Sequence, residues 1–118
     1  MTVEASIFDL LKGLVSTRVY PDVAPANVAK PYIVYQQVGG DVVTFVDNMV
    51  PSKQNGRFQF STWAATRAAA ATLALQVENS LTTAVAFQAR PLGAPTARYE
   101  PDGPVYGAQQ DFSIWSDR

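Results

Sequence analysis

The hydrophobic positions of the chain change their spacing several times, and each spacing predicts a different element. Between residues 3 and 14 the apolar side chains recur every three or four positions, which is the period of a helix with one buried face. Thr2 is placed to cap the first turn, where Glu4 also favours the positive end of the helix dipole. The pattern therefore predicts a helix over residues 3–14.

Three segments in the first half of the chain have the pattern of strands. Residues 18–20 form a short extended piece before a proline-containing link, and residues 31–38 are dense in aromatic and β-branched side chains. In residues 56–61, Phe58 and Phe60 alternate with polar neighbours, as in a half-buried strand. The start of the second segment is apolar on both faces, so other parts of the protein are expected to pack against both faces.

Two further strands are predicted near the end of the chain. Residues 85–90 run up to a proline, and residues 109–115 place Phe112 and Ile114 on one face. The connection between these strands is rich in proline and glycine. Within this connection, Arg98 and Tyr99 are expected to be extended.

An alanine-rich segment with helical spacing lies between these two groups of strands. We expect a helix over residues 67–83, capped by Thr66. Leu75 lies nearly opposite the predicted buried stripe, beside Ala68 and Ala71, where a solvated helix normally carries Lys and Glu. A lone exposed leucine among good helix formers explains this face as well as a subunit interface does. The interface interpretation requires the three side chains to be continuous in space.

The order of these elements predicts an α+β fold in one domain, residues 1–118. The expected architecture is a single mixed or antiparallel β-sheet packed by two α-helices, in the order α-β-β-β-α-β-β. A mixed sheet follows if the long helix is a crossover. The predicted core consists of Phe58, Phe60, Trp63, Leu73, Val77, Leu81, Phe112 and Ile114.

A long loop is predicted over residues 39–55. It carries Asp41 and Asp47 near its start and Lys53 near its end, among several turn-forming residues. Loops of this length within small domains are often functional or disordered. A simple hairpin end accounts for the segment equally well.

The residue types exclude most catalytic chemistry. The chain has no cysteine and no histidine, so thiolate ligands, disulfides and the commonest proton shuttle are missing. Glu100 and Asp102 are close in sequence, but the proline and glycine around them indicate a turn. We therefore expect no enzyme, no cofactor and no metal site.

The charge balance argues against a protein that grips nucleic acid. Nine Lys and Arg residues are scattered among ten Asp and Glu residues, with a pI near 5.2. Binding to the phosphate backbone relies on clustered basic side chains. A surface that faces passing nucleic acid without holding it remains compatible with this balance. No apolar run approaches the roughly 20 residues that a membrane span requires.

Four segments of the chain together resemble a known family. They are "RVYPDVAP", "PYIVYQQVGG", "RFQFSTWAATRAAAATLALQVENSL" and "YEPDGPVYGAQQDFSIW". In this order they are similar to the successive blocks of the tail terminator and tail completion family of long-tailed bacteriophages. The resemblance covers most of the chain.

This resemblance implies a structural virion protein that is assembled in the host cytoplasm. It would form a ring, usually of six copies, on the head-proximal end of the tail tube, end tube polymerisation and present the head-tail joining surface. Its partners would be further copies of itself, the tail tube protein and a head-tail connector or neck protein. DNA would only pass through the channel, and no membrane would be involved.

On this interpretation, two regions become candidate contacts. Ala68, Ala71 and Leu75 would form one patch of the ring, and the exposed face of an edge strand the other. The loop with Asp41, Asp47 and Lys53 would contact the tube or line the channel. Two alternatives stay open: a head-side connector or neck adaptor, and a cellular α+β module that binds a small ligand.

Overall fold

The elements form one sheet with two helices, in a computed structural model that describes residues 2–44 and 50–118. They follow in the order α1 (Val3–Leu11), a short 3-10 turn η1 (Lys12–Leu14), β1 (Val19–Pro21), β2 (Tyr32–Gln37), β3 (Lys53–Ala64), α2 (Arg67–Thr82), β4 (Gln88–Pro91), β5 (Thr96–Glu100) and β6 (Val105–Asp117). The predicted α+β class is confirmed. The structure adds the strand β5 inside the connection that is rich in proline and glycine.

The sheet is mixed. Across the described residues it has six strands in the order β1-β2-β3-β6-β4, and β5 pairs with the same edge of β6 as β4 does. β1 and β2 are parallel, whereas the other neighbouring strands are antiparallel. α2 is indeed a crossover, since it joins β3 to β4. These two strands run in the same direction but are separated by β6.

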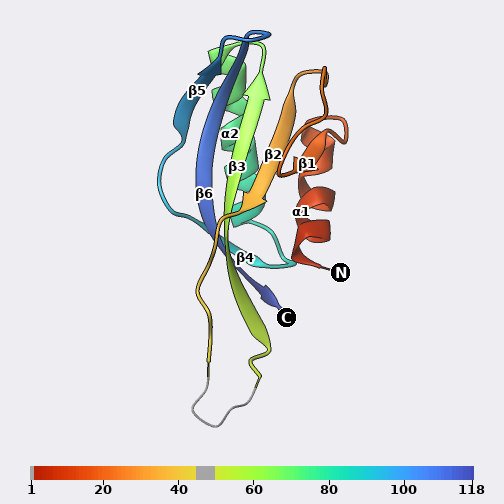
Figure 1. The fold of residues 1–118 in the computed structure, drawn as a ribbon. Coiled ribbons are helices and arrows are strands. Elements are labelled where there is room, and N and C mark those ends of the chain that lie inside the picture. Colours follow the sequence, from red (N-terminus) through yellow and green to blue (C-terminus); the bar gives the residue numbers. More distant parts are fainter. Residues whose placement is uncertain (1, 45–49) are drawn as a thin grey trace.

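Both helices pack against one face of this sheet (Figure 1). Each helix starts at a threonine whose hydroxyl accepts a backbone hydrogen bond at 3.1 Å, from Ala5 to Thr2 in α1 and from Ala69 to Thr66 in α2. At the start of α2, the buried hydroxyl of Thr62 lies 3.2 Å from the carbonyl oxygen of Ala70. This contact fixes the level of α2 relative to β3.

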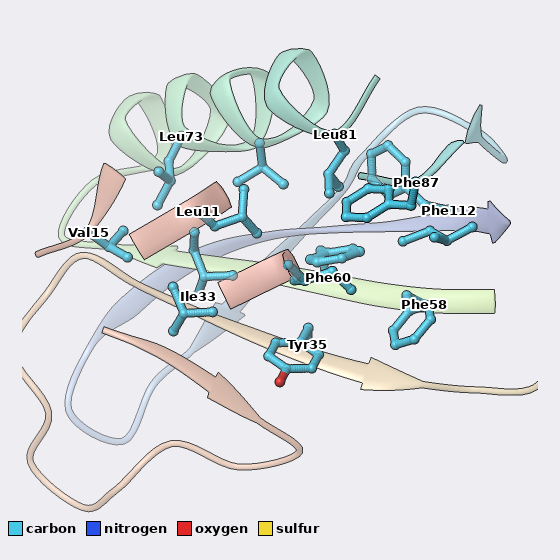
Figure 2. Close-up of a cluster of buried hydrophobic side chains, with 14 residues drawn as sticks. Leu11, Val15, Ile33, Tyr35, Phe58, Phe60, Leu73, Leu81, Phe87 and Phe112 are labelled. Atoms are coloured by element: carbon cyan, nitrogen blue, oxygen red, sulfur yellow. The ribbon is translucent and has the colours of Figure 1, made fainter. Parts of the chain in front are cut away.

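The core lies between the helices and the sheet (Figure 2). Strand alternation places Phe58 and Phe60 on this face, paired with the residues of β6 that face the same way. The rings of Phe60 and Phe112 meet edge to face, with their centroids 5.5 Å apart. Of the predicted core, the buried residues are Phe58, Phe60, Leu73, Val77, Leu81, Phe112 and Ile114.

Trp63 is the exception to the predicted core. It is half-buried and lies on the opposite face of the sheet, since β3 continues to Ala64 and keeps its alternation. In this alternation Thr62, not Trp63, points toward the helices, and Thr62 is 1% exposed. The prediction was wrong because it ended the strand too early.

The molecule is elongated, with principal extents of 53 × 26 × 23 Å. One end carries the arm, which we define as residues 38–44 and 50–56, the described part of the β2–β3 connection and the start of β3 (Figure 1). The start of β3 at Lys53 shortens the predicted loop, because residues 53–55 pair with β6. The body and the arm therefore lie along one long axis.

Candidate assembly surfaces

The outward side of α2 carries the small and apolar residues that the sequence singles out. Ala68, Ala71 and Leu75 are exposed, and 57% of the surface of Leu75 is accessible. At spacings of three and four residues on a regular helix, their side chains are neighbours on one face. The continuity that the interface interpretation requires is therefore present in this helix.

The sheet face opposite the helices is the second exposed surface, and we call it the open face. β2, β3 and β6 contribute alternate residues to it, here half-buried or exposed: Tyr32, Val34, Gln36, Arg57, Gln59, Ser61, Trp63, Gln109, Asp111, Ser113 and Trp115. Amide and hydroxyl groups dominate its centre. Aromatic and apolar side chains occupy the end near the start of α2.

At that end Trp63 is held by close packing. Its ring stacks on Tyr32, with centroids 6.5 Å apart and an interplanar angle of 26°. On β6 the residue paired with Trp63 is Gly107, and a Cβ atom added there would lie 2.6 Å from the indole ring. The missing side chain leaves room for the ring against the backbone of β6.

A groove about 420 Å³ in volume runs beside this stack, and we call it the Trp63 groove. One wall is the link after β1, and the floor is formed by polar side chains of the open face. The residues that line it include Asp22, Val23, Ala24, Pro25, Tyr32, Val34, Gln36, Gln59, Ser61, Trp63, Glu100 and Gln109.

The charged side chains among these lining residues are both acidic. Asp22 comes from the link and Glu100 from the end of β5. The pKa of Tyr32 is raised, first by burial and then by the negative charge of Glu100, so the carboxylate lies near the phenol. The groove thus combines an aromatic wall with a negative rim.

The two arginines near the centre of the open face are held by hydrogen bonds, Arg57 to a carboxylate and Arg98 to a neutral amide. Arg57 donates two hydrogen bonds to Oδ2 of Asp111, from Nε at 2.9 Å and from Nη2 at 2.7 Å. Arg98 donates from Nη1 to Oε1 of Gln109 at 2.9 Å. The surface there is polar without a strong local excess of either sign.

The side chain of Asn55 ties the root of the arm to the sheet. Its Oδ1 accepts a hydrogen bond from the backbone N–H of Asp41 at 2.9 Å, and its Nδ2 donates to Oγ of Ser113 at 2.9 Å. Gly40 has a φ of +144°, and a Cβ there would lie 2.5 Å from the carbonyl oxygen of Asn55. The two segments of the arm are thus held close together where the arm joins the sheet.

The charged residues predicted for the loop are not brought together in the described structure. Asp41 is exposed at the arm root, whereas Lys53 belongs to β3 and forms an ion pair with Asp117 of β6. This hydrogen bond and the positive charge of Lys53 lower the pKa of Asp117. Asp47 lies outside the described residues.

Other kinds of site have little support in residues 2–44 and 50–118. Within these ranges, no group of three or more His, Cys, Asp or Glu side chains is placed to hold a metal ion. The helices found in them are too short or too polar to cross a membrane. The features that stand out are the outward side of α2, the open face and the arm.

Comparisons with known proteins identify one family by sequence and one similar fold by structure. A model of the family described as tail completion protein gp17 matches residues 5–117. A chain of the solved structure "Virion of native gene transfer agent (GTA) particle" is similar in fold, with a TM-score of 0.62 and 19% sequence identity. The alignment covers 98% of this chain and 95% of that one. No curated protein sequence matches significantly.

Proposed function

Because the chain belongs to the tail completion protein gp17 family, we propose that it caps the head-proximal end of a phage tail tube as a ring. Membership confirms the resemblance seen in the four sequence segments, and it makes the chain a structural virion protein of the tail. The family is not an enzyme family. In the proposed role the ring ends tube polymerisation and presents the surface for head-tail joining.

The observation that carries the proposal is the family match over nearly the whole chain. The shape of the protein supports it. A closed ring needs two different patches on each subunit, because each copy contacts its neighbours through a heterologous interface. The outward side of α2 and the open face are two such surfaces, because α2 lies on the other side of the sheet from the open face.

In the proposed ring, Ala68, Ala71 and Leu75 form one subunit contact. Alanine side chains allow the close approach of a neighbouring surface, and Leu75 supplies apolar area that water otherwise covers. We expect six copies in the ring, as the family resemblance implies.

The arm is the proposed contact with the tail tube or the channel. It extends from one end of the elongated body, so a ring of parallel subunits presents all its arms on one side. Acidic groups such as Asp41 would repel DNA that passes through the channel. The other proposed partners are the tail tube protein on the arm side and a head-tail connector protein on the opposite side.

The first test is native mass spectrometry of the purified protein over a range of concentrations, with electron microscopy of any large species. A closed ring, especially of six copies, is the expected result. The same measurement is repeated with purified tail tubes, so that assembly templated by the tube end is also detected. A chain that stays monomeric and does not bind tubes would contradict the proposal, as would recovery on tail-less heads alone.

The ring contact is tested by Leu75→Arg, with Gln76→Arg as the matched control. Both positions are exposed on α2, but Gln76 lies outside the strip of Ala68, Ala71 and Leu75. Leu75→Arg should leave a folded monomer that forms no ring, whereas Gln76→Arg should assemble. Normal assembly of Leu75→Arg would eliminate this patch.

The arm is tested by deleting residues 42–48. The body keeps its helices and sheet, so the ring should still form while binding to the tube end is impaired. Tube lengths measured by electron microscopy report on capping. If the shortened chain limits tube length normally, the segment is only a connection.

A further inference from the structure

We propose that the Trp63 groove receives the first half of α2 from a second copy of this chain. The inference rests on the ring of the proposed function and names the two surfaces that meet in it. Each subunit then donates its α2 to one neighbour and receives α2 of the other neighbour in its groove.

The charges of the two surfaces are complementary. The rim of the groove carries the carboxylates of Asp22 and Glu100. From its start to Val77, α2 has a single charged residue, the exposed Arg67, next to Ala68. A helix laid in the groove of a second copy brings this arginine toward the acidic rim, and opposite charges favour the pairing.

Shape supports the same pairing. On the outward side of the helix, Ala68 and Ala71 are small and Leu75 is a large, exposed apolar side chain. The groove offers Tyr32 and Trp63 as an aromatic wall. The small side chains of Ala68 and Ala71 let the helix backbone approach this wall closely, and Leu75 adds apolar contact area further along the groove, toward Gln59.

The two surfaces lie at the same level along the molecule. The hydroxyl of Thr62 contacts the carbonyl oxygen of Ala70 at 3.2 Å, so the start of α2 lies directly behind the groove. Along β3 the groove extends from Trp63 to Gln59, about 13 Å at about 3.3 Å per residue. Along α2, Ala68 to Leu75 spans about 11 Å at about 1.5 Å per residue. When the two surfaces lie at the same level along the long axis of the molecule, neighbouring copies are related by a rotation without translation along that axis. Such a contact can close into a ring, whereas an added translation would build a helical filament.

The directions of the two surfaces fit a ring of moderate size. At about 100° per residue, the strip of Ala68, Ala71 and Leu75 centres about 135° from the buried stripe of α2. The buried stripe of α2 faces the sheet, and the open face lies beyond the sheet on its other side (Figure 1). The direction from α2 to the sheet is therefore also the direction in which the open face points. Closed rings of six to eight subunits need contact directions about 120° to 135° apart.

The decisive experiment is site-directed cross-linking. Because the chain has no native cysteine, only the introduced cysteines can react. Ala71→Cys on α2 is combined with Ser61→Cys in the groove, and the full-length protein is treated with a short bismaleimide under conditions where it assembles. A ladder of linked subunits that ends at the ring size is the expected result. Both single-cysteine variants should give few linked products.

The matched control combines Ala71→Cys with Ser113→Cys. Ser113 lies on the same open face but outside the groove, beside the arm root. Rings that form without links between positions 61 and 71, or with equal linking at position 113, would overturn the inference and leave the proposed function intact. Links that stop at dimers, or that join this chain to another tail protein instead, would also overturn it. Absence of any ring, with or without tubes, would contradict both.

Charge reversal provides an independent test. Arg67→Glu and Glu100→Arg should each weaken assembly, by about fivefold for an exposed pair, and the double variant should recover much of that loss. The measurement is the concentration at which half of the protein is in rings. Losses that simply add in the double variant would overturn the pairing.

Discussion

The two faces of the sheet differ in what holds their side chains in place. On the covered face, Phe58, Phe60 and Phe112 are almost completely buried beneath the helices. On the open face, the contacts include an ion pair between Arg57 and Asp111 and the stacking of Trp63 on Tyr32. Burial of apolar area is the dominant favourable term in folding, so the covered face specifies the fold. The open face can keep exposed side chains for contacts with other molecules.

The largest effect should come from the covered face. Phe112 has no accessible surface and packs edge to face on Phe60. Phe112→Ala should lower the free energy of unfolding by about 3–5 kcal/mol, since the buried ring is lost and a cavity remains. Urea denaturation followed by tryptophan fluorescence measures this change.

The matched control is Trp115→Ala, three residues further along the same strand but on the open face. Its side chain is 37% exposed, so its removal should cost clearly less than that of Phe112. Circular dichroism replaces fluorescence for this variant. Equal losses at the two positions would mean that the open face contributes to the core as much as the covered face does.

Gly107→Ala tests a place where the open face is tightly packed. The added Cβ would lie 2.6 Å from the ring of Trp63, so the ring or the strand has to move. We expect a loss of about 1–3 kcal/mol from overpacking, together with a shift in tryptophan fluorescence. Gly93→Ala is the control, because a Cβ there has no heavy atom within 4 Å. An unchanged stability for Gly107→Ala would show that Trp63 is free to move.

Tyr35 tests the edge of the covered face through pH. Burial, followed by the charge and hydrogen bond of Glu4, raises the pKa of Tyr35 to about 12. The folded state therefore favours the neutral phenol. The stabilisation that the neutral phenol gives to the folded state is fully present below about pH 10, the pKa of an unfolded tyrosine. It is lost as the pH rises toward about 12.

Tyr35→Phe should consequently remove part of the alkaline loss of stability. At neutral pH the variant should be less stable by up to about 1 kcal/mol, because the interaction of the buried phenol with Glu4 is removed. Denaturation of both proteins across the alkaline range measures the difference, with Tyr99→Phe as a control at a half-exposed site. If the stability difference between wild type and Tyr35→Phe stayed constant up to pH 12, the phenol would not be coupled to folding.

The same contrast explains how much of the structure could be predicted from the sequence. Elements with a clear period were found, since Phe58 and Phe60 repeat every second residue and the stripe through Leu73 and Val77 repeats every three or four. β5 was missed as a strand because all of its residues are exposed and none marks a buried face. Periodicity reports burial, so it identifies the covered face far better than the open one.

Of the candidate surfaces, too, one could be predicted from the sequence and one could not. The exposed position of Leu75 follows from the helical period within one segment. The Trp63 groove depends on pairing among Tyr32, Trp63 and Gly107, which are far apart in the sequence. The alternation after Phe60 did contain a signal, because it assigns Trp63 to the open face. Which residues lie opposite Trp63 follows from strand register, and local pattern does not determine register across long connections.

The smallest expected effect is at the ion pair of the open face. Arg57 is about half exposed and Asp111 is 20% exposed, so solvent screens much of their attraction. A double-mutant cycle with Arg57→Ala and Asp111→Ala should give a coupling energy of about 0.2–1 kcal/mol that decreases at high salt. The pair of Lys53 and Asp117 at the arm is more exposed and should couple less. A coupling energy at Arg57 that persisted in high salt would mean that the open face is shielded from water, as it would be if a neighbouring copy covered it. The same cycle is then repeated in the Leu75→Arg background, which should not form rings. A coupling energy that still resists salt there belongs to a strong ion pair within one chain.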